Sequence, residues 1–161
     1  MFKLKKKTCF WLAASLLCMA VIFIFSSFPA EQSSGMSNPL VDFVLPVIKK
    51  WFGVAVPAAT VEFLYMLIRK AAHLLIFLTL GVCVTNTVRQ VKSNGKRLFL
   101  ISFCWCSLYA ATDELHQYFV PGRACKWQDW LLDSIGALIG IGIVMLTLRR
   151  RRRRMKLDKP L

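Results

Sequence analysis

The sequence predicts an all-α integral membrane protein built as a bundle of four transmembrane helices. Hydrophobic residues make up 57% of the 161-residue chain, above the roughly 45–50% typical of soluble domains. The formal net charge is nevertheless +14, so apolar and charged residues must be segregated along the chain. The charges do fall between long uncharged runs. Because backbone in lipid must satisfy its own hydrogen bonds, such runs favour helices.

Four apolar runs come close to the roughly 20 residues that a spanning helix needs. We expect helices over about 8–28, 61–88, 98–119 and 130–148. The first contains no charged residue, and the third is the shortest uncharged run. The whole chain, 1–161, is then one membrane domain that ends in a basic tail over 149–161.

The segment between the first two helices is apolar but does not read as a span. It follows a loop rich in Ser, Pro, Gly and Asn, and it is interrupted by Pro46, Gly53 and Pro57. Charges at Asp42 and Lys49 divide it further. This pattern predicts an external amphipathic helix at the membrane interface, or a short re-entrant piece.

The basic residues predict the orientation of the bundle in a cell membrane. Most of the 22 Lys and Arg residues lie in the N-terminal tail, the loop between the second and third helices, and the C-terminal tail. These segments share one side of a four-span bundle, and the positive-inside rule makes that side cytoplasmic. Both termini are therefore expected in the cytoplasm. The run Arg149–Arg154 directly follows a span, which is typical of a stop-transfer anchor on anionic lipid, so no nucleic-acid partner is expected.

Polar and ionisable residues gather at the outer ends of the last three predicted helices. On each helix some of these residues are three or four apart, which places them on one face, and the others flank that face. They are Arg69, Lys70 and His73 on the second helix, Asp113, Glu114, His116 and Gln117 on the third, and Asp129 and Asp133 on the fourth, with Arg123 in the loop between. Charged groups in a span cost about 2.5–3.5 kcal/mol each at the helix centre. The stripes are therefore predicted to converge on a polar cup that opens outward.

Two local patterns refine this cup. Gly136-x-x-x-Gly140 allows the fourth helix to approach a neighbour closely just below Asp133. Pro121-Gly122 predicts a turn that folds Arg123 back over the cup. The alternative is a set of interhelical salt bridges with no further role.

Three pieces of the chain carry a family resemblance: "RKAAHLLIF", "DELHQYFVPGR" and "WQDWLLDSIGALIG". They resemble the pattern of the VanZ-like family of small bacterial membrane proteins, which is Lys-x-x-His, Asp-Glu-x-x-Gln-x-Phe-x-x-x-Arg and Asp-x-x-x-Asn/Ser-x-x-Gly. The positions that fall on it are Lys70, His73, Asp113, Glu114, Gln117, Phe119, Arg123, Asp129 and Gly136, and Asp133 stands where the pattern has Asn or Ser. The resemblance implies a relation to proteins that confer low-level resistance to teicoplanin, a lipoglycopeptide acting at the outer face of the membrane.

The expected function is to bind or modify an anionic lipid, a wall precursor or a lipoglycopeptide-related ligand at the outer leaflet. In an enzyme, Asp113 or Glu114 would act as the base and His73 or His116 would shuttle protons. The groups expected to bind the substrate are Arg69, Lys70, Gln117, Arg123, Asp129 and Asp133. A non-catalytic protein would use the same cup to hold a lipid head group, and the sequence is compatible with both.

A metal-dependent enzyme is a further alternative, with Asp113, Glu114, His116, Asp129 and Asp133 as oxygen-rich ligands for Mg²⁺, Mn²⁺ or Ca²⁺. The neighbouring cations disfavour it, so no metal or other cofactor is expected. Membrane lipids and a lipid-linked or cell-wall ligand are the expected partners. A transporter is disfavoured because four spans without repeats make alternating access difficult.

Overall fold

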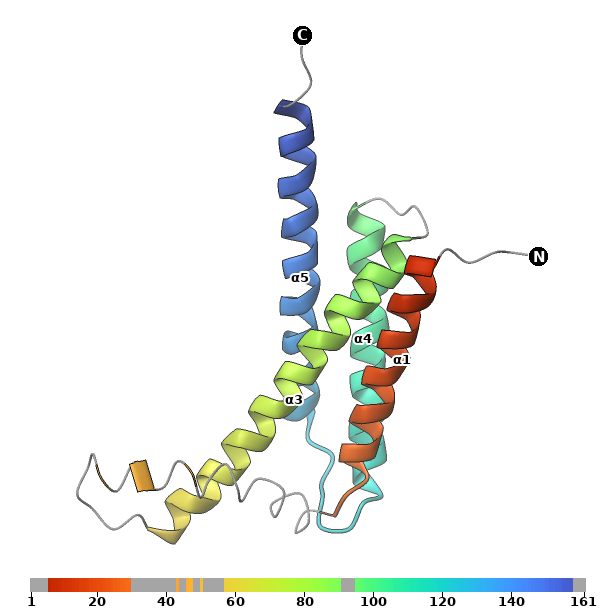
Figure 1. The fold of residues 1–161 in the computed structure, drawn as a ribbon. Coiled ribbons are helices and arrows are strands. Elements are labelled where there is room, and N and C mark those ends of the chain that lie inside the picture. Colours follow the sequence, from red (N-terminus) through yellow and green to blue (C-terminus); the bar gives the residue numbers. More distant parts are fainter. Residues whose placement is uncertain are drawn as a thin grey trace.

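A computed structural model describes residues 6–29, 57–90 and 95–157, together with positions 43, 46, 47 and 50. In this part of the chain the helices are α1 (Lys6–Ser26), α3 (Ala58–Arg89), α4 (Gly95–Tyr118) and α5 (Trp127–Leu157) (Figure 1). Each contains a stretch long and apolar enough to cross a membrane, and these described segments hold no strand. The predicted four-helix membrane fold is confirmed, and the chain is a multi-pass membrane protein. The interfacial or re-entrant segment expected between α1 and α3 falls almost entirely outside the described residues and stays a prediction.

The helix ends differ from the expected ones mainly at the C-terminus. We expected the last helix to end near residue 148, but α5 continues through the arginine run to Leu157. Arginine is a strong helix former, and the sequence places no glycine or proline there to stop the helix. The side chains at 151–155 are exposed, and α5 extends beyond the other helices at its C-terminal end (Figure 1).

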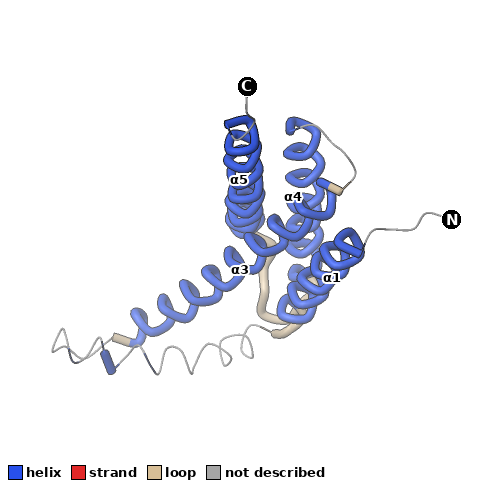
Figure 2. Tube along the Cα trace, turned by 45° about the horizontal axis from the view of Figure 1, so that its top comes forward, coloured by secondary structure: helices blue, strands red, loops and turns tan. Residues whose placement is uncertain are grey.

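The bundle is organised around α3, which contacts each of the other three helices and packs most extensively against α5. Figure 2 shows α3 crossing between α1 and α5. The core lies in the second half of α3 and its neighbours, and comprises Ile22, Phe77, Leu80, Val84, Cys106, Ala110 and Ala137. The first turns of α3 reach beyond the bundle, and most side chains from 58 to 67 are exposed.

Glycines set the close approach of α3 and α5. A Cβ at Gly136 would lie 2.5 Å from the carbonyl oxygen of Leu74, and one at Gly140 would collide with the carbonyl oxygen of Leu78. In the reverse direction, a Cβ at Gly81 would collide with the backbone of α5. The close approach expected of the Gly136-x-x-x-Gly140 pattern is thus made to α3, with backbone against backbone.

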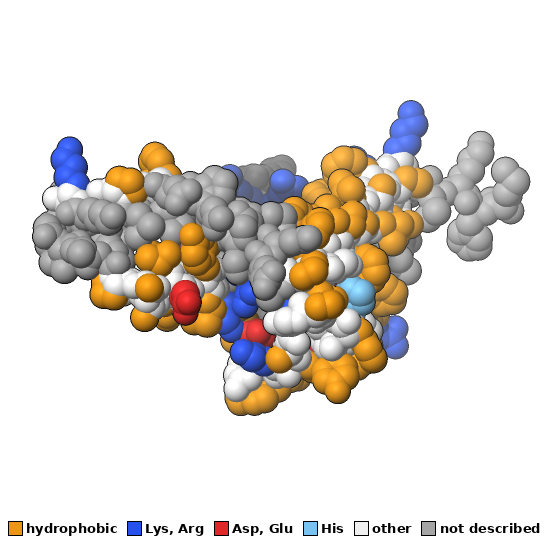
Figure 3. Space-filling model, turned by 90° about the horizontal axis from the view of Figure 1, so that it is seen from below, with side chains coloured by type: hydrophobic (Ala, Val, Ile, Leu, Met, Phe, Trp, Pro, Cys, Tyr) orange, Lys and Arg blue, Asp and Glu red, His pale blue; other side chains and the backbone are white. Residues whose placement is uncertain are grey.

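The two ends of the bundle differ in character. The start of α1 and the arginine-rich end of α5 lie at one end (Figure 1). At the other end, the last turns of α1 and α4 meet the first turns of α5 and the middle of α3, and we call this the polar end. Seen from there, basic and acidic side chains lie together within a mostly hydrophobic surface (Figure 3).

Candidate functional site

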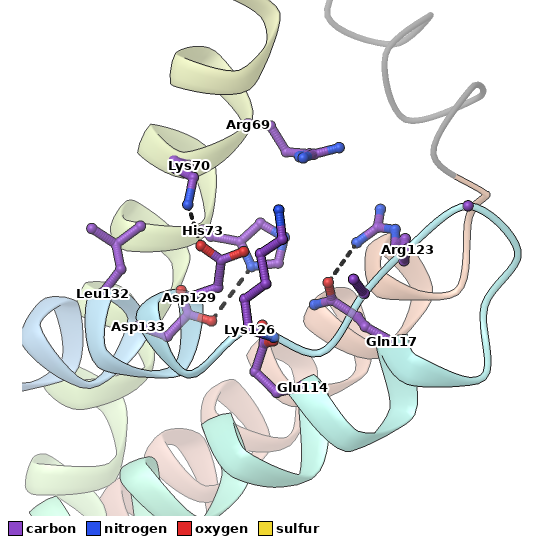
Figure 4. Close-up of a pocket in the computed structure, with 12 residues that line it drawn as sticks. Arg69, Lys70, His73, Glu114, Gln117, Arg123, Lys126, Asp129, Leu132 and Asp133 are labelled. Carbon is purple, nitrogen blue, oxygen red and sulfur yellow. Dashed lines mark hydrogen bonds and ion pairs between the residues drawn. The ribbon is translucent and has the colours of Figure 1, made fainter. Parts of the chain in front are cut away.

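The polar end contains a cavity of about 130 Å³ between α3, α4, α5 and the loop that joins α4 to α5 (Figure 4). Its walls are formed by Arg69, Lys70, His73, Glu114, Gln117, Gly122, Arg123, Ala124, Lys126, Asp129, Leu132 and Asp133. The polar stripes predicted on three separate helices therefore converge. Of the predicted site residues, Asp113 and His116 do not line the cavity.

Two contacts between a basic and an acidic side chain connect α3 to α5 among the described residues. The Lys70 ammonium contacts the Asp129 carboxylate, and His73 Nδ1 lies 3.6 Å from Asp133 Oδ2 (Figure 4). Both acids come from the first two turns of α5, so the pairs hold that helix end against the middle of α3. An interhelical salt bridge, which the alternative hypothesis expected, therefore does form between Lys70 and Asp129.

Asp113 is buried behind the cavity and is held from two sides. The Ser26 hydroxyl of α1 donates to Asp113 Oδ2 at 2.9 Å, and Gln117 Nε2 donates to the same oxygen at 2.8 Å. The Gln117 carbonyl oxygen in turn accepts a hydrogen bond from Arg123 NH1 at 3.0 Å. A chain of hydrogen bonds therefore leads from the loop, through Gln117, to the Asp113 carboxylate.

Arg123 is positioned by the turn that precedes it. Gly122 has φ 74°, a conformation that favours glycine, and the turn brings the guanidinium back to line the cavity. Its Nε donates to the Phe28 carbonyl at 3.0 Å and its NH2 to the Phe25 carbonyl at 3.2 Å, so it also holds the end of α1. Burial and the nearby Arg69 lower the pKa of Arg123 from its usual range, against the attraction of the acids around it.

The other two predicted catalytic residues of α4 have structural contacts. His116 stacks on Phe23 of α1, with ring centroids 4.6 Å apart, and its Nε2 lies 3.1 Å from the Ser27 hydroxyl. It faces α1 instead of the cavity. Glu114 lines the cavity but also accepts the backbone N–H of Lys126 at 3.0 Å, which fastens the loop just before α5.

Two cations that line the cavity have side chains without a partner among the described residues. Among the described residues, neither the Arg69 guanidinium nor the Lys126 ammonium forms a hydrogen bond or an ion pair, and both extend toward the cavity in Figure 4. Sequence reasoning missed Lys126, although it stands three positions after Arg123 in the same loop. It also missed Ser26, whose signal was a polar Ser-Ser pair at the end of an apolar first helix.

A group of ligand-type atoms lies at the inner wall of the cavity. One atom each from His73, Asp113 and Asp133 can be chosen so that all lie within 4.8 Å of one another. Asp133 is 1% exposed, and neither of its carboxylate oxygens has a hydrogen-bond partner in the described part of the chain. The sequence-based ligand set shares Asp113 and Asp133 with this group but lacks His73.

The fold and the site together define a small multi-pass membrane protein with a buried polar site at one end of its helix bundle. The family model described as VanZ/LLP1 matches residues 10–148, most of the chain. The protein therefore belongs to the VanZ/LLP1 family, as the three sequence motifs predicted. Neither a curated protein nor a solved structure matches the chain.

Proposed function

We propose that the cavity at the polar end binds the phosphate or carboxylate of an anionic envelope component, either a lipid head group or a lipid-linked wall precursor. The observation that carries this proposal is the pair of unpartnered cations, Arg69 and Lys126, directed into the cavity. The other basic residues there are engaged, because Lys70 is paired with Asp129 and Arg123 is bonded to Gln117 and to α1.

The chemistry of these two cations fits an anion. Hydrogen bonds between charged partners are roughly twice as strong as neutral ones. The planar guanidinium of Arg69 matches two oxygens of a phosphate or carboxylate, while the Lys126 ammonium acts as a point charge beside it. A bound anion would therefore complete the charge balance of the cavity.

The volume of the cavity limits the size of the chemical group that can bind in it. Sites for drug-sized ligands measure roughly 300–1,000 Å³, and this cavity measures about 130 Å³. It suits the charged head of a lipid, while the hydrocarbon part would remain along the apolar sides of the helices. An effect on teicoplanin susceptibility would then act through the lipid or wall precursor held in the cavity, because the body of a lipoglycopeptide is too large for it.

Charge along the chain supports an outward-facing cavity. The arginine-rich end of α5 lies at the opposite end of the bundle (Figure 1). The positive-inside rule favours a cytoplasmic location for that end. The polar end would then meet the outer leaflet of the cell membrane, where lipid-linked wall components are exposed.

Binding of farnesyl phosphate, compared with uncharged farnesol, tests the proposal. The full-length protein in detergent should bind the phosphate at least tenfold more tightly than the alcohol, a difference of about 1.4 kcal/mol. Arg69→Gln and Lys126→Gln should each weaken binding of the phosphate about tenfold. The matched control is Arg153→Gln at the opposite end of the bundle, which should bind normally. Equal affinity for farnesol, or unchanged affinity in both variants, would refute the proposal.

An enzymatic form of the same function is supported by His73 and Asp133 at the cavity wall, where a bound head group would lie next to an acid–base pair. Mass analysis of the farnesyl phosphate recovered after incubation distinguishes the two forms. Release of farnesol and inorganic phosphate would identify a hydrolase, and recovery of the intact phosphate would identify a binder.

A further inference from the structure

We propose that His73, Asp113 and Asp133 form a binding site for one divalent transition-metal ion, Zn²⁺ or Mn²⁺, at the inner wall of the cavity. The three residues come from α3, α4 and α5, so the ion would join three helices at one point. This inference does not rest on anion binding, because it concerns the buried wall and can be measured without any ligand.

The spacing of the three residues fits ligands of one ion. His73 Nδ1 and Asp133 Oδ2 are 3.6 Å apart, which is too long for a hydrogen bond. Two ligand atoms that each lie about 2.1 Å from a tetrahedral ion are about 3.4 Å apart. The three atoms all lie within 4.8 Å of one another, so an ion between them requires only small adjustments.

Asp133 gives an independent reason to expect a cation. Its carboxylate is almost completely buried, and both oxygens lack a hydrogen bond to any residue that the structure describes. Buried polar side-chain atoms nearly always have a partner, and each exception requires an explanation. Because the nearest basic group, His73, is beyond hydrogen-bond distance, a metal ion is the partner that would satisfy the carboxylate.

Asp113 has the surroundings of an oriented metal ligand. Ser26 and Gln117 both donate to its Oδ2, and Arg123 fixes Gln117 from behind. Such hydrogen bonds to a ligating carboxylate commonly set its direction and tune the metal. The hydrogen bonds from Ser26 and Gln117 both go to Oδ2, and Asp113 Oδ1 accepts none from the described residues. On this view Gln117 and Arg123 are positioning residues for Asp113.

The donor set selects the class of ion. An imidazole favours zinc and related transition metals over Mg²⁺ and Ca²⁺, and carboxylates are also accepted by Mn²⁺. Two carboxylates balance the charge of a divalent ion, and Lys70, one turn away on α3, is already paired with Asp129. Three protein ligands leave a coordination position open, as in catalytic zinc sites. His73 and Asp133 both line the cavity, so that position would face it.

The metal content of the full-length protein tests the inference. The protein would be produced in medium with added Zn²⁺ and Mn²⁺, purified in detergent with a tag that contains no histidine, and measured by elemental mass spectrometry. We expect close to one ion per chain, falling at least tenfold in His73→Gln and in Asp133→Asn. Glu62→Gln is the control, because this exposed acid lies near the start of α3 and outside the cavity wall, and it should retain the ion.

A second measurement covers the case in which these variants fail to fold. Wild-type protein stripped with a chelator should show a lower melting temperature that saturating Zn²⁺ or Mn²⁺ restores, as measured without added lipid. A wild-type protein with less than about 0.1 ion per chain, and with a melting temperature that neither ion changes, would overturn the inference. So would metal content that stays the same in folded His73→Gln and Asp133→Asn. Failure of farnesyl phosphate binding alone would leave the metal site standing.

Discussion

Replacing Gly136 by alanine tests whether the close approach of α3 and α5 sets the geometry of the polar site. A Cβ at this position would lie 2.5 Å from the Leu74 carbonyl oxygen, whereas ordinary contacts begin at 3.4 Å. The opposing atom is backbone and cannot rotate away. The two helices must therefore separate by about 0.9 Å at this level, an overpacking strain of a kind that typically costs about 1–3 kcal/mol.

The separation of α3 and α5 would directly change the geometry of the polar site. Leu74 follows His73, and Gly136 lies one turn after Asp133, so the same movement lengthens the 3.6 Å distance between His73 and Asp133. Displacements of about 1 Å in a site can reduce activity on the order of 100-fold. We therefore expect Gly136→Ala to lower the free energy of unfolding by about 1–3 kcal/mol and to weaken metal binding at least tenfold.

Denaturation of the purified protein by sodium dodecyl sulfate in mixed micelles measures the first effect, and metal content measures the second. Gly142→Ala is the matched control, because a Cβ there meets nothing within 4 Å and alanine favours a helix over glycine by about 1 kcal/mol. The control should be as stable as the wild type or more stable. If Gly136→Ala unfolds at the same detergent fraction as Gly142→Ala, the glycine contact does not set the helix spacing.

A membrane-impermeant thiol reagent should label the exposed Cys125 in intact cells, with Cys125→Ser as the unlabelled control. Arg153→Cys introduced into the Cys125→Ser protein should react only after permeabilisation. The reverse pattern would put the polar end in the cytoplasm. His116→Gln should retain farnesyl phosphate binding within about twofold, because the imidazole faces α1; a tenfold loss would place His116 in the ligand site. Arg123→Lys should lower the free energy of unfolding by about 1–2 kcal/mol, because one ammonium cannot replace donors that reach Gln117 and the carbonyls of Phe25 and Phe28. Unchanged stability would contradict this structural role.

The sequence predicted the helices and the convergence of the polar stripes because both depend on local spacing. The length of an apolar run identifies a membrane span. Residues three or four apart share a helix face, so Lys70 and His73 were expected to lie on the same side of α3. Charge alone does not decide which acid meets which base on another helix. The pairing depends on rotation and depth, which here are set by backbone contacts such as that of Gly136 with Leu74.

His116 and Ser26 also show that spacing along one helix does not determine contacts with another helix. His116 is next to Gln117 in the sequence, but the 100° rotation per residue in a helix turns it toward α1 instead of the cavity. Ser26 was not considered, because a Ser-Ser pair at the end of an apolar helix has no helical periodicity that predicts a partner on another helix. Its role depends on α1 packing against α4, a tertiary contact that no spacing within α1 encodes.

Substitutions at Arg69 and Arg123 distinguish a role in ligand binding from a role in stabilising the protein. A loss of function in Arg123→Lys does not identify an anion site, because Nε, NH1 and NH2 already serve protein acceptors and their loss loosens Asp113 and α1. Arg69 has no such contacts within the described chain, and substitutions at sites of this kind usually change stability by less than about 0.5 kcal/mol. Arg69→Gln should therefore keep the wild-type unfolding transition and metal content while losing about tenfold in affinity for farnesyl phosphate. Lost stability in this variant would show that Arg69, like Arg123, supports the protein, and the unpartnered cation would no longer argue for an anionic ligand.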